Sequence, residues 1–504
     1  MRCVLFIFAL LTAPCVAAGS DLVSKGDSPS PAYQTTPFFD VRTFGVIGNG
    51  TTDDTVAMQN AINAACRSGG RGMRILAWNS VTNKPLSMLV SSTVDFTKCW
   101  GVFFDGGSSQ GEATENTSGF IWGGAAGGIV LLVNQTRDST FQNFFIDTQT
   151  SVGHNNANVG LDIDEDGTVT TITTNNVYRN ILVRSHDSNA KLVGIRLGKN
   201  APGNVERQIF DHITVDCSDN AATSSNNGIG WQINGANGAE PYWVELHDYD
   251  PGNCSRGSDV EAANILKIDG GLAAGNYTDL YCGGGRGITY RDVRSENGTA
   301  QIAIAGNCID LTTENLSFSG LTAGTSTYSY LSSAGGTSLS VAHNSWDNVA
   351  VTPIAGPTNP NSATFRLQGN IFPTGTCPPT PGNTFQYGGW ELGDYQTNGL
   401  PCPDWIVIGN TGLNLRGNLS VWTHLNQNTA GTWAGTCTMS SGACSAITFG
   451  TPYTKAVACQ VTWTGTGKLT GILSSNRTTR GLQPKSSIAT DTAQVDWFCG
   501  GNPN

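Results

Sequence analysis

Charged side chains occupy the same position in a series of similar short segments. The series begins with Asn143-Phe-Phe-Ile-Asp147, and its last position reads Asp147, Arg184, Asp216, His247 (fitted into the longest gap) and Glu296. If the segments are strands stacked about 4.8 Å apart, Asp147 and Asp216 lie about 9.6 Å apart with Arg184 between them. An inverting glycosidase needs an acid and a base roughly 6.5–9.5 Å apart. We therefore predict Asp147 and Asp216 as catalytic acid and base, in either order, with Arg184 orienting the substrate. An ion-pair ladder is the alternative.

A second series of segments carries another polar column. Its members are Gly160-Leu-Asp-Ile-Asp164, Gly194-Ile-Arg-Leu-Gly198, Gly230-Trp-Gln-Ile-Asn234 and Ile265-Leu-Lys-Ile-Asp269. A polar column can line a groove for a sugar chain by hydrogen-bonding its hydroxyls and pairing with its uronate groups. The predicted substrate-binding residues are Asp162, Arg196, Gln232, Lys267 and Glu296. A solvated sheet face accounts for the second column equally well.

The segment Asp162-Ile-Asp-Glu-Asp-Gly167 has the start of a calcium-binding loop. Asp162, Asp164 and Asp166 are the predicted ligands, although position twelve is Thr173, where such loops need a bidentate acid. A bound Ca²⁺ would acidify a proton beside a uronate carboxylate, and Arg196 is the candidate base of such a lyase. A turn with solvated carboxylates is the alternative.

Both series recur at similar spacing, which predicts the element that positions these residues. The second series advances by 34, 36 and 35 residues, and the first by 37, 32 and then 80, a gap in which a coil can be hidden. Alternation within a strand places Leu161 and Ile163 inside and Asp162 and Asp164 outside. Since no single coil can bury its apolar side chains alone, the coils must stack. The pattern predicts an all-β fold, a parallel β-helix over residues 38–375.

The two ends of this domain carry their own signals. After Phe39, residues 55–65 have helical periodicity, with Val56, Ala57, Ala61, Ile62 and Ala65 on one apolar face. Asp53 or Asp54 is the expected helix cap, and a catalytic carboxylate pair is the alternative. A Pro-rich linker is expected over 376–402. Thr-rich alternating segments predict a small antiparallel β module over 403–504.

The segment Phe39 to Ala65, with Phe-Gly…Gly-Asn-Gly-Thr-Thr-Asp-Asp-Thr, resembles the opening of the pectate lyase superfamily, closest to its rhamnogalacturonase-like and epimerase-like branch. The resemblance implies a right-handed parallel β-helix capped by a strand and a helix. The Asn-Thr-Asp, Gly-His-Gly and Arg-Ile-Lys signatures of polygalacturonases are missing, so their catalytic residues cannot be transferred. The end of the chain, up to Gly500, resembles terminal modules of phage tail proteins.

Composition and the N-terminus indicate the compartment. Residues 1–18 read as a secretory signal, with Arg2, an apolar run too short to span a bilayer, and the cleavage site Val16-Ala17-Ala18. Residues 19–37 read as a leader. Cleavage leaves 12 of the 14 cysteines, and Cys437 with Cys444, and Cys459 with Cys499, are candidate disulfides. The net charge of −11 argues against a nucleic acid partner.

Three functions stay open at this point. The first is a secreted glycoside hydrolase acting on a pectin-like or other acidic polysaccharide, for which no cofactor is required. The second is a calcium-assisted polysaccharide lyase or epimerase. The third is a non-catalytic carbohydrate-binding adhesin or tailspike-like protein. The resemblance also allows a homotrimer, because spikes and fibres of this architecture are often trimers.

Overall fold

The protein is known from a computed structural model. It describes residues 38–67, 73–79, 84–107, 117–149, 155–164, 172–187, 189, 191–199, 204–219, 227–234, 240–296, 301–320, 326–330, 337–346, 352–354, 363–373, 375, 389–396, 402, 405–407, 432–441, 443–448, 458–463, 468–469, 473–477 and 481–500. The predicted signal and leader lie outside these residues. Among the described residues, no helix is long and apolar enough to cross a membrane.

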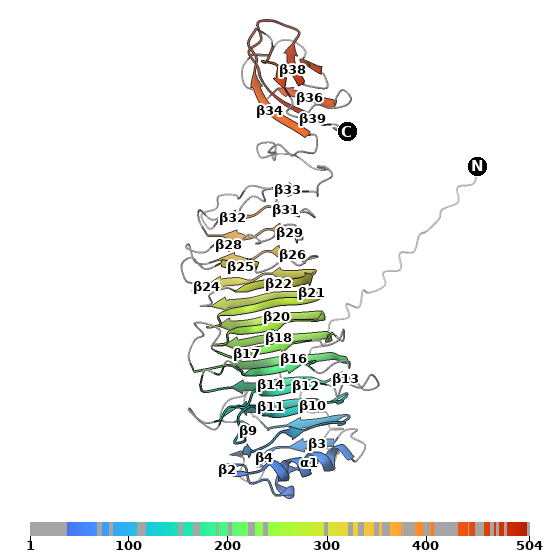
Figure 1. Ribbon diagram of the computed structural model, residues 1–504, viewed down its shortest axis with the longest axis vertical. Helices are drawn as coiled ribbons and strands as arrows, with labels where there is room; N and C mark the ends of the chain where they lie inside the picture. Colours follow the sequence, from blue (N-terminus) through green and yellow to red (C-terminus); the bar gives the residue numbers. More distant parts are fainter. Residues whose placement is uncertain are drawn as a thin grey trace, which may run out of the picture.

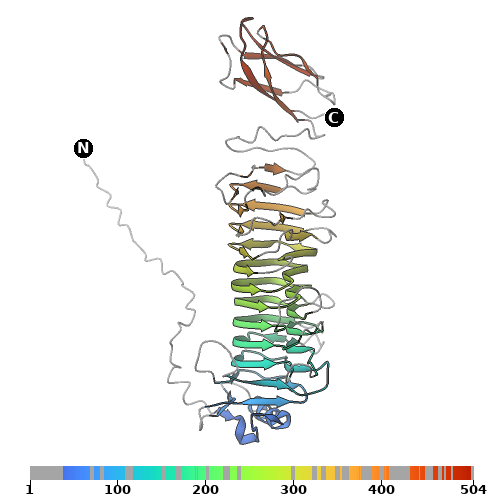
Figure 2. The ribbon, with the colours of Figure 1, turned by 90° about the vertical axis from the view of Figure 1, so that its left-hand side faces the viewer.

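Stacked parallel strands form the body of the molecule (Figures 1 and 2). One run of parallel partners is β10 (Ile129–Asn134), β12 (Val159–Asp164), β15 (Val193–Leu197), β17 (Ile229–Ile233), β19 (Arg256–Val260), β21 (Thr278–Glu296), β22 (Ile302–Ile309), β25 (Ser326–Tyr330) and β28 (Thr352–Ile354). The other is β11 (Thr140–Asp147), β14 (Val177–Arg184), β16 (Asn204–Asp216), β18 (Tyr242–Gly252), β20 (Asn264–Ala274) and again β21. Each strand pairs with the strand one coil further on, which confirms the parallel β-helix.

The remaining strands of this sheet extend the stack at both ends. At the N-terminal end lie β1 (Phe38–Asp40), β2 (Asn49–Asp53), β3 (Met73–Leu76), β6 (Ser87–Val90), β7 (Val94–Asp95), β8 (Val102–Asp105) and β9 (Ser118–Trp122), with a hairpin of β4 (Trp78–Asn79) and β5 (Lys84–Pro85) beside them. Within the stack, β13 (Ile172–Thr174) pairs with β16. Towards the C-terminal end lie β23 (Leu311–Glu314), β24 (Ser317–Ser319), β26 (Thr337–Ala342), β27 (Ser345–Trp346), β29 (Ala363–Gln368), β30 (Ile371–Phe372), β31 (Gly389–Leu392), β32 (Tyr395–Gln396) and β33 (Trp405–Val407).

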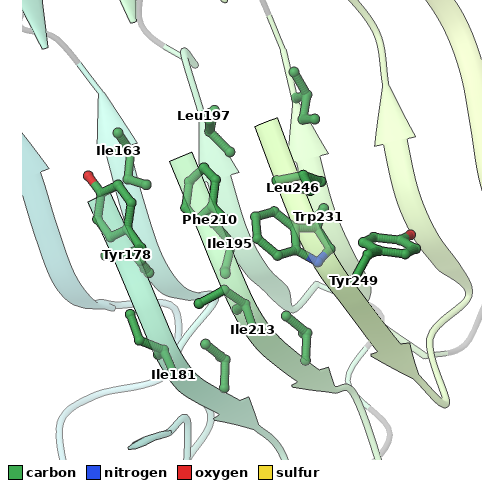
Figure 3. Close-up of a cluster of buried hydrophobic side chains, with 14 of the residues drawn as sticks. Ile163, Tyr178, Ile181, Ile195, Leu197, Phe210, Ile213, Trp231, Leu246 and Tyr249 are labelled. Carbon is green, nitrogen blue, oxygen red and sulfur yellow. The ribbon is translucent and has the colours of Figure 1, made fainter. Parts of the chain in front are cut away.

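Inward-facing side chains stack from coil to coil and form the core (Figure 3). The ring of Tyr178 is 5.3 Å from that of Phe141 and 4.7 Å from that of Phe210, which in turn lies 4.9 Å from Trp231. Each such aromatic pair contributes about 0.5–1.5 kcal/mol beyond its area burial. This stacking holds the coils in register.

A column of left-handed residues turns each coil at the same place. It contains Asn143, Asn180, His212, Asp248, Gly270, Asp292, Asn315 and His343, all with φ between 49° and 75°. Asn and Asp tolerate this conformation better than other non-glycine residues. Asn180 Nδ2 also donates to Asn143 Oδ1 at 2.9 Å, so this corner is bonded between coils. Because every coil turns here, outward residues beyond the corner fall into straight columns.

The first coil is capped by η2 (Val41–Phe44) and α1 (Thr55–Arg67). Asp53 Oδ1 accepts from the backbone N–H of Thr55, the first residue of α1, at 3.0 Å, and the Asp54 carbonyl accepts from the Met58 N–H within the helix. Both oxygens of Asp54 accept backbone N–H groups, from Ile47 and Gly48. The two acids are therefore structural. The predicted apolar face holds for Ala61, Ile62 and Ala65, but Val56 is exposed.

The coils continue beyond residue 375, the predicted end of the helical domain, since β31 and β32 pair in parallel with β29 and β30. The strands near the C-terminus are antiparallel, as expected: β34 (Thr432–Thr438) and β36 (Ala458–Trp463) flank β39 (Gln494–Gly500), and β35 (Ile447–Thr448) and β37 (Leu473–Arg477) flank β38 (Gly481–Ser486).

Disulfides link neighbouring parts of the chain. They join Cys66 with Cys99, Cys217 with Cys254, Cys282 with Cys308, and Cys437 with Cys444, the last as predicted. Cys459 and Cys499 are register partners in β36 and β39, but their side chains lie outside the described part of the structure.

Candidate active site on the outer face of the coils

The predicted column Asp147–Arg184–Asp216 exists in the strand register. Arg184 is the Cα partner of Asp147 in β11 and of Asp216 in β16. The next positions are Gly252 and Ala274, and the sixth is Glu296. His247 was expected after Asp216, but it pairs with Asp211 in another column. The gap of 80 residues from Asp216 to Glu296 holds two intermediate positions, and the steps from Gly252 to Ala274 and from Ala274 to Glu296 span only 22 residues each.

Asp147 is the buried acid at the start of this column. Its side chain is 4% exposed, and its Oδ2 accepts from Arg184 Nε and Nη2 at 3.1 and 3.0 Å. His186 Nε2 lies 3.1 Å from the same oxygen, and the Gln149 backbone N–H donates to Oδ1. These contacts and the burial of Asp147 favour a positioning role over direct contact with a substrate. Its assignment as catalytic acid or base stays a prediction.

Arg184 links the buried acid to the surface. Its side chain is 21% exposed, and its guanidinium lies 5.8 Å from the ring centre of Phe145. Asp147 holds the guanidinium through Nε and Nη2, so this partly exposed cation is fixed in orientation. A cation held in this way can bind a carboxylate or hydroxyl of a sugar without first losing much conformational entropy.

Asp216 is the acid of the column with a perturbed pKa. Its burial raises the pKa, and the negative charges of Asp219 and Asp250 raise it further. Hydrogen bonds from Asn253 Nδ2, at 3.0 Å, and from the Ser218 backbone N–H act in the opposite direction. The net direction is upward, which favours the protonated carboxyl that a general acid needs.

A cleft on the same outer face reaches Thr214, two residues before Asp216, although Asp216 is not itself one of its lining residues. It has a volume of about 390 Å³ and is lined by Asn180, Ile181, Leu182, His212, Thr214, Asp248, Asp250, Gly271 and Leu272. Thr214 is two residues before Asp216 and donates from Oγ1 to Asp250 Oδ2 at 3.0 Å. His212 Nδ1 lies 2.5 Å from Asp248 Oδ2 at the corner of the coils. We call Asp216, Asp219 and Asp250 the acid cluster.

Sequence reasoning missed two members of the acid cluster. Asp250 is the Cα partner of Thr214, one coil away from Asp216. Asp219 lies just after β16, with its Oδ1 3.7 Å from His186 Nδ1. The polar position of Asp250 within a strand was the available signal, but it could be used only after β18 had been placed in register.

The second predicted column is confirmed only in part. Asp162, Arg196 and Gln232 are successive Cα partners, but the next position is Asp259, not Lys267. Asp162 is 1% exposed and its two oxygens accept from Arg196 Nε and Nη2 at 2.8 and 2.6 Å. Asp162 and Asp164 point away from the core, yet both are buried, so the expected open groove does not run over them.

Lys267 and Glu296 lie elsewhere. Lys267 belongs to β20 and donates from Nζ to Glu245 Oε1 at 2.8 Å. Glu296 is in the Asp147 column, and its Oε1 is 2.5 Å from Arg294 Nε. The substrate-binding roles of both residues stay predictions.

The calcium ligands do not form a free set among the described residues. Both oxygens of Asp162 bind Arg196, and the Thr173 hydroxyl donates to the Asp164 backbone carbonyl at 2.6 Å. Asp166 lies outside the described residues. Within the described ranges, no three His, Cys, Asp or Glu side chains are grouped to hold a metal ion. Asp162 therefore does not fit the role of a calcium ligand.

Comparisons with known proteins add solved structures of low similarity. No family model and no curated protein matches the chain. The endo-xylogalacturonan hydrolase of Aspergillus tubingensis aligns at 11% identity and TM-score 0.42, over 72% of this chain and 94% of that one. The tailspike protein of Acinetobacter phage vB_ApiP_P1 aligns at 9% identity and TM-score 0.42, over 92% and 87%. PfbA, a surface adhesin of Streptococcus pneumoniae, aligns at 12% and 0.32, over 71% and 90%.

The likeness is one of fold. These identities and TM-scores assign no activity, and the parallel β-helix rests on the strand pairing described above.

Proposed function

We propose that the protein is an exported glycoside hydrolase that cleaves a pectin-like or other acidic polysaccharide, with Asp216 as its general acid. The observation that carries the proposal is the raised pKa of Asp216 in the acid cluster beside the cleft. Perturbed carboxyl groups beside a concave surface are typical of catalytic sites. A carboxyl whose pKa is raised holds its proton to higher pH and can donate it to a glycosidic oxygen.

Asp250 is the proposed general base. It lies diagonally from Asp216, one strand across and two residues along, which corresponds to about 8 Å between the backbone positions. Side chains on these two positions can reach the 6.5–9.5 Å between carboxyl groups that leaves room for a water molecule, as inversion of the anomeric centre requires. Asp250 lines the cleft, whereas the buried Asp147 does not.

The remaining side chains bind and orient. The partly exposed guanidinium of Arg184 pairs with a uronate carboxylate of the substrate, and Asp147 holds that guanidinium in place. Leu182 and Leu272 in the cleft present apolar surface to the C–H face of a sugar ring. Gly252 and Ala274, the next two positions of the column, leave space above Asp216 for the chain to pass.

The reaction balances with these groups alone. Asp216 transfers its proton to the glycosidic oxygen as the bond from that oxygen to the anomeric carbon breaks. Asp250 removes a proton from water as the water oxygen bonds to the anomeric carbon from the opposite face. The proton taken up by Asp250 equals the proton lost by Asp216, so exchange with solvent restores both.

The test is hydrolysis of a panel of uronate-rich and neutral polysaccharides, following new reducing ends and the ultraviolet absorbance of unsaturated ends. We expect reducing ends without absorbance. Asp216→Asn and Asp250→Asn should each lower kcat by at least 100-fold. Asp269→Asn, an outward acid of another column, is the matched control. Absorbance from unsaturated ends would indicate a lyase, and no product from any polysaccharide would indicate a binding protein.

Asp147→Asn distinguishes the two assignments of the second acid. We expect a weaker substrate affinity and a smaller loss of kcat than in Asp250→Asn, because Asp147 acts through Arg184. Complete loss of activity in Asp147→Asn, with full activity in Asp250→Asn, would return the role of base to Asp147.

A further inference from the structure

An exposed tryptophan stands beside a second cavity, on another face of the coils. Trp243 in β18 is 41% exposed. The cavity has a volume of about 320 Å³ and is lined by Asn175, Val177, Arg207, Ile209 and Trp243. Val177 and Ile209 are Cα partners on successive coils, seven residues before Arg184 and Asp216 respectively. The corner at Asn180 and His212 separates this cavity from the acid cluster.

The indole ring of Trp243 is held in one orientation. Its Nε1 donates to Glu245 Oε1 at 2.7 Å, and Lys267 Nζ lies 5.1 Å from the ring centre. Lys267 also donates to the same Glu245 oxygen, so the three side chains form one bonded group. An aromatic ring fixed before binding loses little entropy when a ligand stacks on it.

The backbone at this place is in an unfavourable conformation. Trp243 has φ 58° and Arg207, one coil earlier, has φ 49°. Left-handed φ is unusual for bulky residues, but here it belongs to a corner that recurs on successive coils, at Asn175, Arg207, Trp243, Ile265 and Gly287. Trp243 and Arg207 therefore occupy left-handed positions that Asn, Asp or Gly would adopt with less strain.

Arg207 supplies charge to the cavity. Its side chain is exposed, and no acid among the residues that the structure describes forms an ion pair with it. Arg207 lies opposite Trp243 on the next coil, because the residues on either side of them are Cα partners: Glu206 with Tyr242, and Gln208 with Val244. The cavity therefore combines an apolar floor, an aromatic wall and a guanidinium that can bind a carboxylate through two hydrogen bonds.

We propose that this cavity binds a uronic acid residue of a polysaccharide, as a site separate from the acid cluster. The apolar face of the sugar ring packs on Trp243, Val177 and Ile209, and its carboxylate pairs with Arg207. The inference rests on the proposed function only in taking an acidic polysaccharide as ligand. It does not require that the acid cluster hydrolyses the chain.

Binding of oligogalacturonate and oligomannuronate to the full chain carrying Asp216→Asn tests the site without turnover. Trp243→Ala should raise the Kd at least ten-fold, and Trp100→Ala should leave it unchanged. Trp100 is the matched control, since it is 54% exposed and has a cation, Arg137, 5.4 Å from its ring centre. Thermal melts of both variants confirm folding, and Trp243→Phe should retain most of the affinity.

Arg207→Gln tests the charge. It should weaken binding of the uronate chains but not of the same oligogalacturonate after reduction of its carboxyl groups. Equal Kd values for Trp243→Ala and the parent, or no binding of either uronate chain by the parent, would overturn the inference. In a chain with Asp216 intact, Trp243→Ala should keep the parent's kcat on a short substrate. Loss of binding at the Trp243 cavity can therefore be distinguished from failure of the hydrolase proposal.

Discussion

Arg196 donates from Nε and Nη2 to the two carboxylate oxygens of Asp162 on the preceding coil, at 2.8 and 2.6 Å. Both side chains are almost fully buried. Two charges removed from water in this way compensate each other through short hydrogen bonds, and neither is free for a substrate or a metal ion. The pair is therefore a structural contact between two neighbouring coils.

Replacing Arg196 alone should lower the free energy of unfolding far more than replacing Asp162 and Arg196 together. Arg196→Met leaves Asp162 buried without its cation, and we expect the free energy of unfolding to fall by about 3–5 kcal/mol. The double variant Asp162→Leu/Arg196→Met should recover most of this loss. Chemical denaturation of the parent and both variants measures these free energies of unfolding. A single variant as stable as the parent would show that the pair is not stabilising.

Two substitutions beside Asp216 should move the pH dependence of hydrolysis in opposite directions. Activity requires protonated Asp216, so it declines as the pH rises through the pKa of this carboxyl. Asp219→Asn removes a charge that raises the pKa of Asp216, and the basic limb should shift to lower pH. Asn253→Ala removes a hydrogen bond that lowers this pKa, so the limb should shift to higher pH. Profiles of kcat/KM measure both, and shifts of the same sign would contradict Asp216 as the acid.

Asp279 should make the protein less stable as the pH rises from 4 to 7. Complete burial raises its pKa to about 7, although bonds from Ser295 and Asn276 act in the opposite direction. In the unfolded chain the pKa is about 3.9, so between these values only the unfolded state releases the proton. Stability is highest below pH 4 as far as this group is concerned, falls up to pH 7 and is then constant.

The variant Asp279→Asn isolates this effect. It keeps the shape of the side chain but cannot ionise, so its free energy of unfolding should decline less between pH 4 and 7. Asp259, whose pKa burial raises to about 6, contributes to the slope in both proteins and cancels in the comparison. Parallel stability curves for parent and variant would exclude Asp279 as the source.

A chelator should leave the melting temperature unchanged. Asp162 offers no free oxygen to Ca²⁺, because both of its oxygens bind Arg196. Thermal melts with and without EDTA measure this. A lower melting temperature in EDTA that added Ca²⁺ reverses would support the calcium loop predicted at Asp162, Asp164 and Asp166.

The sequence by itself was sufficient for the fold and for one column of the candidate site. Alternating short segments 32–37 residues apart predicted stacked parallel strands, and Asp147, Arg184 and Asp216 were placed correctly relative to one another. This worked because strands in neighbouring coils keep their register wherever coil lengths are similar. The disulfide between Cys437 and Cys444 could also be predicted, because only seven residues separate the two cysteines along the chain.

The tertiary structure decided what the spacing did not. Coil lengths vary, since Asp259 follows Gln232 after only 27 residues, whereas Gly252 follows Asp216 after 36 and Ala274 follows Gly252 after 22. A constant repeat therefore placed Lys267 and His247 in the wrong columns and left Asp250 unnoticed. A side chain that points away from the core is also not necessarily exposed to solvent, since Asp162 points outward and is buried. The raised pKa of Asp216 depends on burial and on acids from the next coil and from the segment after its own strand. Such properties arise from distances in space, which the order of residues along one strand does not contain.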